Sequence, residues 1–226
     1  MEIDGVPIQP IDSKFFDEEK EYVITFYFGK KIKNANGMFQ GCPIKSIDLT
    51  QFDPTGITDV SYMFGSCIYL SSIKISGEYK PNSTKGMFYH CQNLESLDLS
   101  GFYLSNTKDM NEMFMSNYKL PSLDLSNFDT SNVTDMGNMF DGCTSLKSLD
   151  LSPCRTWKVL SMSYMFSQCT SLTEVTMTSG IYNLTNTTNM FYKIKTKGTF
   201  YYNDGYGEYD RVIVPKLPST WTAVSV

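Results

Sequence analysis

The amino-acid sequence predicts an α/β repeat solenoid, in which about seven units of 24–26 residues form a right-handed coil with one parallel β-sheet. Two observations predict this fold class. A Met-Phe pair recurs at a nearly constant interval, and a leucine-rich frame follows six of the seven pairs. The pairs begin at Met38, Met63, Met87, Met113, Met139, Met165 and Met190. Intervals this regular do not arise by chance, so each unit is one turn of a repeating structure.

The leucine-rich frame has the form Leu-x-x-Leu-x-Leu, and its last part alternates apolar and polar residues. In Leu97-Asp98-Leu99-Ser100, the leucines face one side of an extended chain and the polar residues face the other. This period of two predicts one short, half-buried strand in every unit. The expected strands lie at 21–28, 45–50, 71–76, 95–100, 121–126, 147–152, 173–178 and 198–202.

The segment that contains the Met-Phe pair has a different period. The apolar residues of 132–140 are spaced by three and four residues, which predicts a short helical segment on the return side of the coil. Thr134 suits the cap of its first turn, and the charge of Asp135 suits a helix N-terminus. Each unit is therefore expected to be a strand, a turn, a short helical segment and a return.

One such coil cannot bury its apolar side alone, so its neighbours must stack on it. The expected core consists of columns of like residues, Leu on Leu, Met on Met, Phe on Phe and Cys on Cys. Residues 1–37 are expected to form an N-terminal segment with a cap strand, 38–194 the solenoid, and 195–226 an aromatic β-rich C-terminal cap. Within this last cap, strands are expected at 198–202 and 212–214.

The six cysteines follow the repeat rather than a metal-binding spacing. Five of them stand four residues after the Met of their unit: Cys42, Cys67, Cys91, Cys143 and Cys169. Cys154 takes a position that Phe holds in other units. Because no Cys-x-x-Cys motif and only one histidine are present, we expect buried free thiols, no metal site and no cofactor. His90 precedes Cys91 but holds a variable position, so we expect no Cys–His catalytic pair.

With these residues in view, the stretch LDLSNFDTSNVTDMGNMFDGCTSLKSLDLS closely resembles the BspA-like leucine-rich repeats of bacterial surface proteins. The similarity covers about 38–194, and the terminal GTFYY and LPSTWTAV segments resemble the way such arrays end. The resemblance implies a leucine-rich-repeat coil. It also implies a secreted or surface-anchored protein that adheres to host proteins or to other cells.

The composition of the chain limits the classes of partner that it can bind and the places where it can act. The net charge of −5 and the absence of a long Lys or Arg run argue against a nucleic-acid partner. The longest uncharged apolar run, around 22–28, is too short to span a bilayer. The acidic first 21 residues show no signal-peptide pattern. A virion or cytoplasmic location therefore stays an alternative to the bacterial cell surface.

The outward strand positions form a column of carboxylates, Asp98, Asp124 and Asp150. Such a stripe suits a cation or a basic partner. The alternative is structural, because each Asp can accept hydrogen bonds from neighbouring Ser hydroxyls or loop amides. Asp124 lies between two like charges, so we expect its pKa to be raised.

Aromatic residues that differ between units are the other candidates for recognition. Each is either exposed for protein or sugar contact or packed between coils. They are Tyr69, Tyr89, Tyr103, Tyr118, Trp157, Tyr201, Tyr206 and Tyr209. Of these we select Tyr118, together with Tyr206 and Tyr209 from the Gly- and acid-rich segment 203–210, as binding candidates.

The function predicted from these features is a non-enzymatic binding module, adhesin-like, that contacts a protein or a glycan through the faces of the solenoid. No paired-carboxylate cleft, phosphate loop, nucleophile elbow or zinc-protease motif is present in the sequence. The alternative is a structural, decoration or receptor-binding component of a bacteriophage virion, docked through residues 1–20. Homo-oligomers or docking to a larger assembly fit either function.

Overall fold

A computed structural model describes the chain at residues 2–3, 6–7, 24–25, 32–75, 77–203, 205 and 208–226. The chain forms two compact units, Met1–Ile32 and Lys33–Val226. In the first unit, β1 (Glu2–Ile3) pairs antiparallel with β2 (Val6–Pro7) and with β3 (Ile24–Thr25). Of the strand predicted at 21–28, only β3 lies within the described residues.

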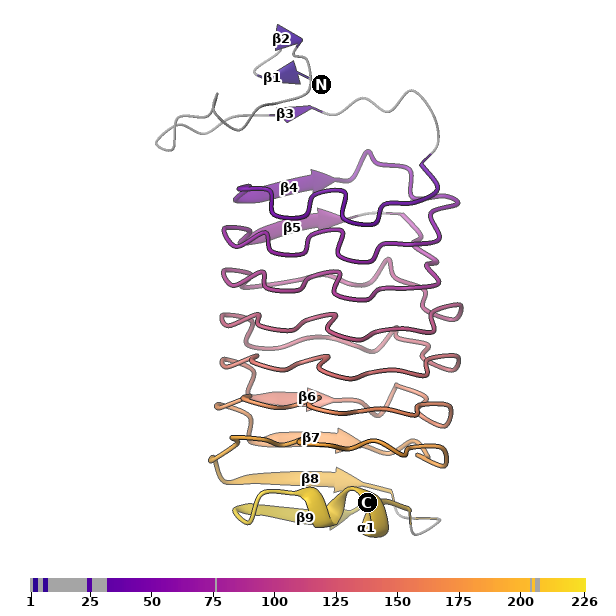
Figure 1. Cartoon of the computed structure of the whole chain (residues 1–226), viewed down its shortest axis with the longest axis vertical. Coiled ribbons are helices and arrows are strands. Elements are labelled where there is room, and N and C mark those ends of the chain that lie inside the picture. Colours follow the sequence, from indigo (N-terminus) through magenta and orange to yellow (C-terminus); the bar gives the residue numbers. More distant parts are fainter. Residues whose placement is uncertain are drawn as a thin grey trace. The chain divides into compact units, whose positions relative to one another are not determined.

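The second unit is a stack of seven coils, which we number by their Met-Phe pairs (Figure 1). Each coil has a sheet side, such as 148–152, a loop edge, such as 127–133, and a front side, such as 135–143, which contains the Met-Phe pair. One residue from each front side joins a continuous series of parallel bridges: Asn34, Asp59, Ser83, Asp109, Asp135, Ser161 and Asn186. The predicted number of repeats is therefore confirmed.

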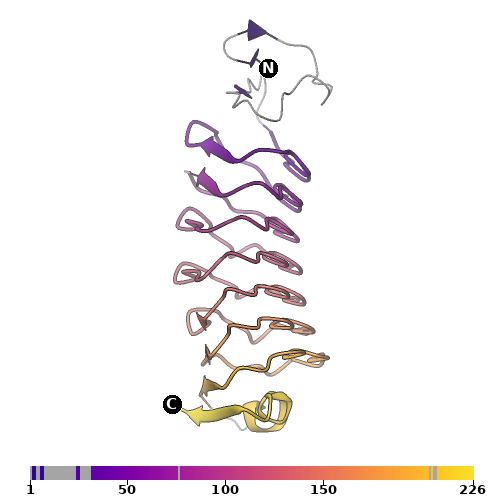
Figure 2. The ribbon, with the colours of Figure 1, turned by 90° about the vertical axis from the view of Figure 1, so that its left-hand side faces the viewer.

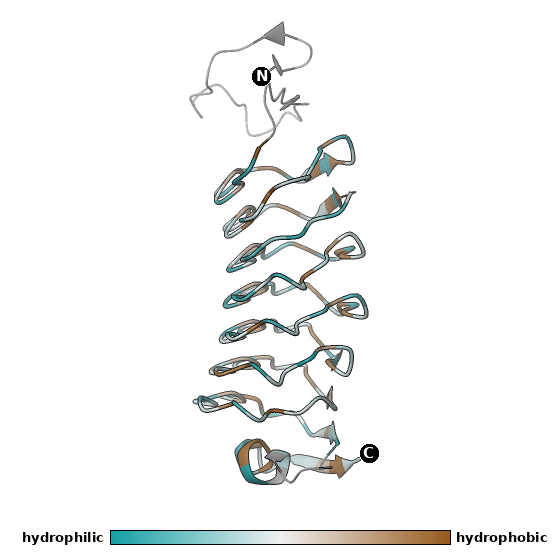
Figure 3. Ribbon diagram, turned by 90° about the vertical axis from the view of Figure 1, so that its right-hand side faces the viewer, coloured by the Kyte–Doolittle hydropathy of each residue, from teal (hydrophilic) through white to brown (hydrophobic). Residues whose placement is uncertain are grey.

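Columns of like side chains fill the interior, as predicted. The Phe rings of the seven Met-Phe pairs form one stack from Phe39 to Phe191, with successive ring centroids 5.5–6.0 Å apart and nearly parallel planes. Hydrophobic and hydrophilic stretches alternate along each coil (Figure 3), and the Phe, Met and Leu side chains of the columns are buried. The rod buries its core only because each ring is covered by its neighbours.

The cysteine column lies against this stack. The thiol of Cys143 donates to the carbonyl oxygen of Phe114 in the preceding coil at 3.1 Å, and Cys169 does the same with Phe140 at 3.0 Å. All six cysteines are free, five of them buried and Cys42 half-buried. The prediction of free thiols acting as small core residues is confirmed.

The front side is not helical, so the predicted helical segment is wrong. Two positions per coil, the residue before each Met and the second residue after each Phe, have a positive φ. A right-handed helix requires negative φ at every residue. Two left-handed residues on each front side therefore prevent a helix from forming there. The non-glycine residues at these positions are Tyr62, Ser66, His90, Glu112, Ser116, Asn138, Tyr164, Gln168, Asn189 and Lys193.

The front side instead bonds to the next coil. In six consecutive coils the amide of the Phe donates to the carbonyl oxygen of the next coil's Met, at 2.8–3.0 Å. We call this series of amide–carbonyl bonds the front ladder. The expected helix cap is also different: the hydroxyl of Thr134 donates to the carbonyl oxygen of Lys108 at 3.1 Å, and Asp135 accepts the amide of Gly137 at 2.7 Å.

The sheet side forms two separate parallel sheets instead of one. The first contains β4 (Ser46–Leu49) and β5 (Ser72–Ile75). The second contains β6 (Ser148–Asp150), β7 (Glu174–Met177), β8 (Gly198–Tyr202) and β9 (Trp221–Ser225), in that order. The strands predicted at 95–100 and 121–126 are not formed.

Pro121 explains part of this gap. At the equivalent position of other coils an amide donates to the coil before, as Lys147 does to the carbonyl oxygen of Pro121 at 3.3 Å. Pro121 has no N–H that could donate to the carbonyl oxygen of Glu95. The sheet side therefore lacks one hydrogen bond between the third and fourth coils. Leu97 and Leu123 are only half-buried there, whereas Leu149 in β6 is buried.

The C-terminal segment differs from the prediction in its second half. The strand expected at 212–214 is wrong, because α1 (Glu208–Val212) and the 3-10 turn η2 (Val214–Lys216) occupy this region. Pro215 within η2 disfavours a strand at this point. The second strand is β9, which pairs parallel with β8 and brings Trp221 to within 6.0 Å of the ring of Phe191. Trp221 thereby packs against the last ring of the Phe stack, at the end of the coils where Figure 2 shows β9 and α1 side by side.

Candidate interaction surface

The predicted carboxylate column lies on the outer surface of the sheet side. Asp98, Asp124 and Asp150 are exposed, and each accepts the amide of the residue two positions later at 2.8–2.9 Å. These short-range bonds close the turn that follows the strand segment. The structural interpretation of the column therefore accounts for each carboxylate.

The pKa expected for Asp124 is wrong in direction. The amide and the hydroxyl of Ser126 hold the pKa of Asp124 below its ordinary value. The amide and the hydroxyl of Ser100 lower the pKa of Asp98 in the same way, although the neighbouring charge of Asp124 opposes this shift. A hydrogen bond to an ionised carboxylate outweighs repulsion across an exposed, water-screened surface.

The predicted tyrosines lie in different surroundings. Tyr118 is 39% exposed, and its ring meets that of His90 edge to face at 6.1 Å. Tyr209 is 1% exposed, and its hydroxyl donates to the carbonyl oxygen of Ser179. Because the ring of Tyr209 packs against those of Phe200 and Tyr202, it belongs to the cap and not to a surface site. Tyr206 lies outside the described residues.

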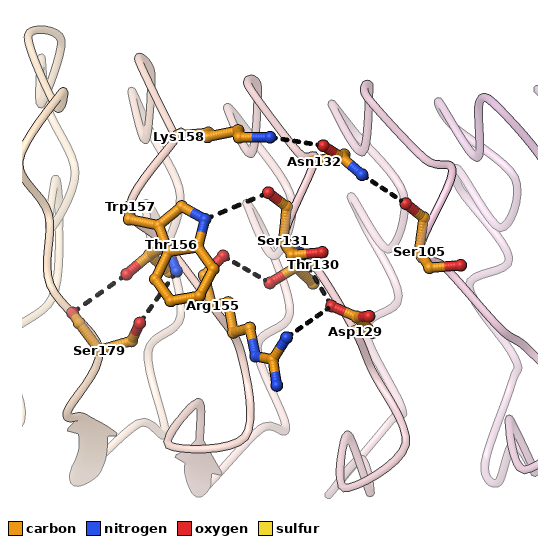
Figure 4. A network of polar contacts seen from close by, with 10 residues as sticks. All are labelled: Ser105, Asp129, Thr130, Ser131, Asn132, Arg155, Thr156, Trp157, Lys158 and Ser179. Atoms are coloured by element: carbon orange, nitrogen blue, oxygen red, sulfur yellow. Dashed lines mark hydrogen bonds and ion pairs between the residues drawn. The ribbon is translucent and has the colours of Figure 1, made fainter.

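Larger exposed side chains lie on the loop edge of the last two coils. Trp157 is 38% exposed, Leu160 49% and Tyr182 52%. Arg155 and Lys158 flank the indole in the same loop. We call these five residues the Trp157 edge, and part of it is shown in Figure 4.

Buried threonines hold the backbone of this edge. The hydroxyl of Thr130 donates to the carbonyl oxygen of Arg155 at 2.9 Å. The hydroxyl of Thr156 lies 3.1 Å from the carbonyl oxygen of Ser179 and 3.0 Å from that of Gly180. Both threonines are essentially buried, so the loop that carries Trp157 is fixed to the coil on either side.

The indole of Trp157 is itself oriented. Its Nε1 donates to the carbonyl oxygen of Ser131 at 3.3 Å, and the Arg155 guanidinium lies 5.6 Å from the ring centroid. Arg155 also pairs with Asp129 at 3.9 Å, but both groups are about half exposed and such pairs contribute little. The ring is therefore held in place (Figure 4), although Trp157 remains 38% exposed.

Tyr182 occupies in the next coil the position that Trp157 holds in its own. Its ring lies over Gly180, where an added Cβ would stand 2.5 Å from the phenol carbon Cζ. A glycine at this position is thus required for the observed pose of the ring. Next to Arg155, an open, shallow depression is lined by Ser126, Asn127, Phe128, Asp129, Pro153 and Arg155.

This arrangement suits contact with another macromolecule. Trp, Tyr and Arg are the residue types that most often carry binding energy at protein interfaces. Within the described ranges, no group of three or more His, Cys, Asp or Glu residues is placed to hold a metal ion. The thiol of Cys91 donates to Phe64 and not to His90, and burial raises its pKa, so these neighbours do not form an activated pair.

Sequence reasoning identified Trp157 only as one of several variable aromatics and missed the rest of the edge. One signal was present in the repeat alignment. The position of Leu160 is polar in every other coil, held by Lys33, Thr58, Asn82, Lys108, Thr134 and Thr185. An apolar residue at an otherwise polar, exposed position marks a site that repeat packing does not require.

The part of the chain that the structure describes contains no helix with the length and apolar character of a membrane span. A search of curated proteins finds no match to this chain. A family model described as "BspA type Leucine rich repeat region (6 copies)" matches residues 7–101. Another, described as "Mycoplasma protein of unknown function, DUF285", matches residues 82–201, more than half of the sequence. The chain therefore belongs to the DUF285 family and is a BspA-like leucine-rich-repeat protein.

Proposed function

We propose that this protein is a non-enzymatic, adhesin-like binding module whose protein partner contacts the Trp157 edge. Leucine-rich-repeat solenoids are typically interaction modules without enzymatic activity, which is the general basis of the proposal. The single observation that carries it is the group of exposed Trp157, Leu160 and Tyr182 on one rigid edge.

The rigidity of the edge supports tight binding. Ordering a large side chain at an interface costs free energy, and a ring that is already held avoids most of this cost. Trp157 is fixed by Ser131 and Arg155, and its loop is fixed by Thr130 and Thr156. The partner therefore meets a preformed surface.

The polar groups around the rings indicate what the partner offers. The Lys158 ammonium donates to Asn132 at 2.6 Å and, like the Arg155 guanidinium, lies at the exposed rim of the edge. The complementary surface is apolar at its centre and carries acceptors or carboxylates at its rim. This composition is that of a protein surface.

The test compares three purified full-length chains: the unmodified protein, Trp157→Ala and Tyr103→Ala. Tyr103 is a matched control, because it is 45% exposed and Lys80 lies 5.6 Å from its ring, as Arg155 does at Trp157. Proteins from host-cell and bacterial surface extracts are captured, and the dissociation constant of each purified captured protein is then measured with all three chains.

The expected result is a loss of about 1–3 kcal/mol of binding free energy for Trp157→Ala and little change for Tyr103→Ala. Thermal unfolding of the variants confirms that both remain folded. Equal affinity of all three chains for every captured protein contradicts the proposal. A glycan that competes with the partner for the same edge changes the assigned partner class to carbohydrate.

The virion alternative depends on residues 1–20 as the docking segment. Most of these residues lie outside those that the structure describes, and no observation within the coils favours it over the binding module.

A further inference from the structure

A row of aromatic rings crosses the front side of the second, third and fourth coils. The ring of Tyr62 meets that of Tyr89 edge to face at 6.2 Å, and Tyr89 lies 5.6 Å from the imidazole of His90. His90 in turn meets the ring of Tyr118, at the end of the fourth front side, edge to face at 6.1 Å. We call Tyr62, Tyr89, His90 and Tyr118 the aromatic row. Its members come from three coils, so only the register of the stack brings them together.

The packing of the coils does not require these rings. The fifth coil forms the same front side with small or polar residues at the four positions, namely Asn138, Asp141, Gly142 and Thr144. In the row, Tyr62, Tyr89 and His90 are half-buried and Tyr118 is 39% exposed. Rings that reach the surface without a packing role indicate a site of recognition.

The ring of Tyr62 is fixed over the third coil. An added Cβ at Gly86 would overlap this ring, so the glycine provides the space that the ring occupies. The Tyr62 hydroxyl donates to Oε2 of Glu112 in the fourth coil at 2.8 Å. Burial and the Glu112 carboxylate raise the pKa of Tyr62, so its hydroxyl keeps the donated proton. The row therefore presents a ring whose pose is set before any partner binds.

Polar groups border the row. The amide nitrogen of Gln92 lies 2.7 Å from Nε2 of His90, and because an amide nitrogen only donates, Nε2 accepts and the imidazole proton lies on Nδ1. Among the described residues, His90 Nδ1, Gln92 Oε1 and Glu112 Oε1 have no hydrogen-bond partner. One donor and two acceptors are thus available beside the rings.

We propose that the aromatic row binds a neutral oligosaccharide built of hexopyranose units. A pyranose has a C–H face that packs on an aromatic ring and a rim of hydroxyls that both donate and accept. Neighbouring rings of the row are 5.6–6.2 Å apart, a spacing close to the length of one pyranose unit in a linear glycan. The Glu112 carboxylate disfavours a negatively charged sugar at the same place.

A protein partner fits the row less well than it fits the Trp157 edge. Three of the four rings in the row are half-buried, so they present little protruding apolar surface. The three apolar side chains of the Trp157 edge are all exposed. The row lies on the front side of coils two to four and the Trp157 edge on the loops of the last two coils. The two proposals therefore concern different sites and are tested with different variants.

The experiment uses the full chain without a histidine tag and three neutral oligosaccharides: cellohexaose, chitohexaose and maltohexaose. Hyaluronan hexasaccharide is the acidic comparison. Isothermal titration calorimetry measures the dissociation constants. NMR follows the imidazole signals of His90, which need no further assignment because His90 is the only histidine in the sequence.

Tyr118→Ala removes the most exposed ring of the row, and Tyr118→Phe keeps the ring without its hydroxyl. Tyr103→Ala is the matched control, since Tyr103 is a similarly exposed tyrosine, at 45%, outside the row. At least one neutral oligosaccharide is expected to bind the unmodified chain and to shift the His90 signals. Tyr118→Ala is expected to weaken this binding about threefold to tenfold, and Tyr118→Phe and Tyr103→Ala less than about twofold. Thermal unfolding verifies that the variants are folded.

The proposal is overturned if none of the three neutral oligosaccharides binds, or if Tyr118→Ala and Tyr103→Ala weaken binding equally. Binding that leaves the His90 signals unchanged would place the glycan elsewhere and also contradict it. Hyaluronan that binds as tightly as the neutral chains would exclude the assignment to a neutral sugar. A protein that is captured through Tyr118, in the absence of any oligosaccharide binding, would make the row a protein contact instead.

Discussion

Single side chains fix the backbone of each coil at recurring places. A short polar side chain at the start of the front side accepts an amide two residues later, as Asp109 does from Asn111 at 2.9 Å. The sheet-side carboxylates repeat this contact after the strand segment. Sequence reasoning found the columns, because their members recur at one position. It did not find the sign of the pKa shift, because that depends on one amide that points at the carboxylate.

For Asp124, the lowered pKa makes a prediction about pH. The ionised carboxylate stabilises the fold above the pKa of the unfolded chain, about 3.9, and this contribution is lost as pH falls through the lower folded value. Asp124→Ala should therefore destabilise the protein at pH 7 and cost less at pH 2. Urea unfolding at both pH values measures this, and a carboxyl titration by NMR at or above the ordinary pKa would contradict it.

The left-handed front positions make a prediction about backbone strain. Ser116 has a φ of 61°, a conformation that costs a residue with a Cβ about 1 kcal/mol and costs glycine little. Ser116→Gly should leave the free energy of unfolding equal or slightly raised. Ser116→Val should lower it by about 1–2 kcal/mol, since a β-branched residue fits this region worst. Denaturant unfolding of both variants distinguishes strain from a loss of side-chain contacts.

Asn117 takes the place of a cysteine in the fourth coil. Its amide nitrogen donates to the carbonyl oxygens of Phe88 and Phe114, both at 2.8 Å, but its buried Oδ1 has no partner. An unsatisfied buried acceptor costs about 1–3 kcal/mol. Asn117→Cys should therefore raise the free energy of unfolding by about 1 kcal/mol, with a thiol that donates to Phe88. An unchanged or lower unfolding midpoint would show that the two amide bonds outweigh the unpaired oxygen.

Secondary-structure elements were harder to predict than the repeat itself. A spacing of three and four residues on the front side gave the expectation of a helix, but the same spacing also fits successive β-turns, each closed by a hydrogen bond between residues three apart. In the structure Met139 donates to Met136 and Asp141 to Asn138, and the left-handed Asn138 stands between them. Apolar periodicity reports which residues point inward and does not report the sign of φ.

The missing amide of Pro121 leads to a prediction about the sheet side. Replacing Pro121 by Ser restores an N–H that can donate to Glu95, as equivalent residues do in other coils. The free energy of unfolding should rise by about 0.5–1.5 kcal/mol, the usual net value of one such bond. Hydrogen exchange should slow at residue 121 and across 95–100. Pro153→Ser is the control, since Pro153 lies in a loop on the edge of the depression described above. A gain in stability without slower exchange would point to proline effects on the unfolded chain.

In the whole molecule, the repeat length determined the fold class, because stacked units can bury their apolar sides in few other ways. The interaction surface was not predictable to the same extent. Trp157, Leu160 and Tyr182 come from two neighbouring coils, and only the three-dimensional register places them on one edge. Their exposure is a property of that arrangement and not of any local pattern.

The C-terminal cap leads to a prediction about the rod as a whole. Removing residues 198–226 uncovers the ring of Phe191, which Trp221 and Phe200 now contact. The shortened chain should associate through this apolar end and unfold at a lower temperature. Light scattering and circular dichroism measure both effects. A chain shortened only after Trp221 keeps part of the cover and should behave between the two. A monomeric 1–197 chain with an unchanged melting temperature would contradict this role of the cap.

The columns of the solenoid also bear on how such a protein changes in length. Every coil presents the same Phe ring and the same front-side donors to the coil after it, so a duplicated unit of about 26 residues meets partners that already fit. Duplication in frame would lengthen the rod by about 4.8 Å per unit and leave both ends unchanged. Insertions of a few residues fall instead on the loop edge, where the coils already differ in length. Gene lineages of this kind are therefore free to vary the reach of the molecule and the chemistry of one edge separately.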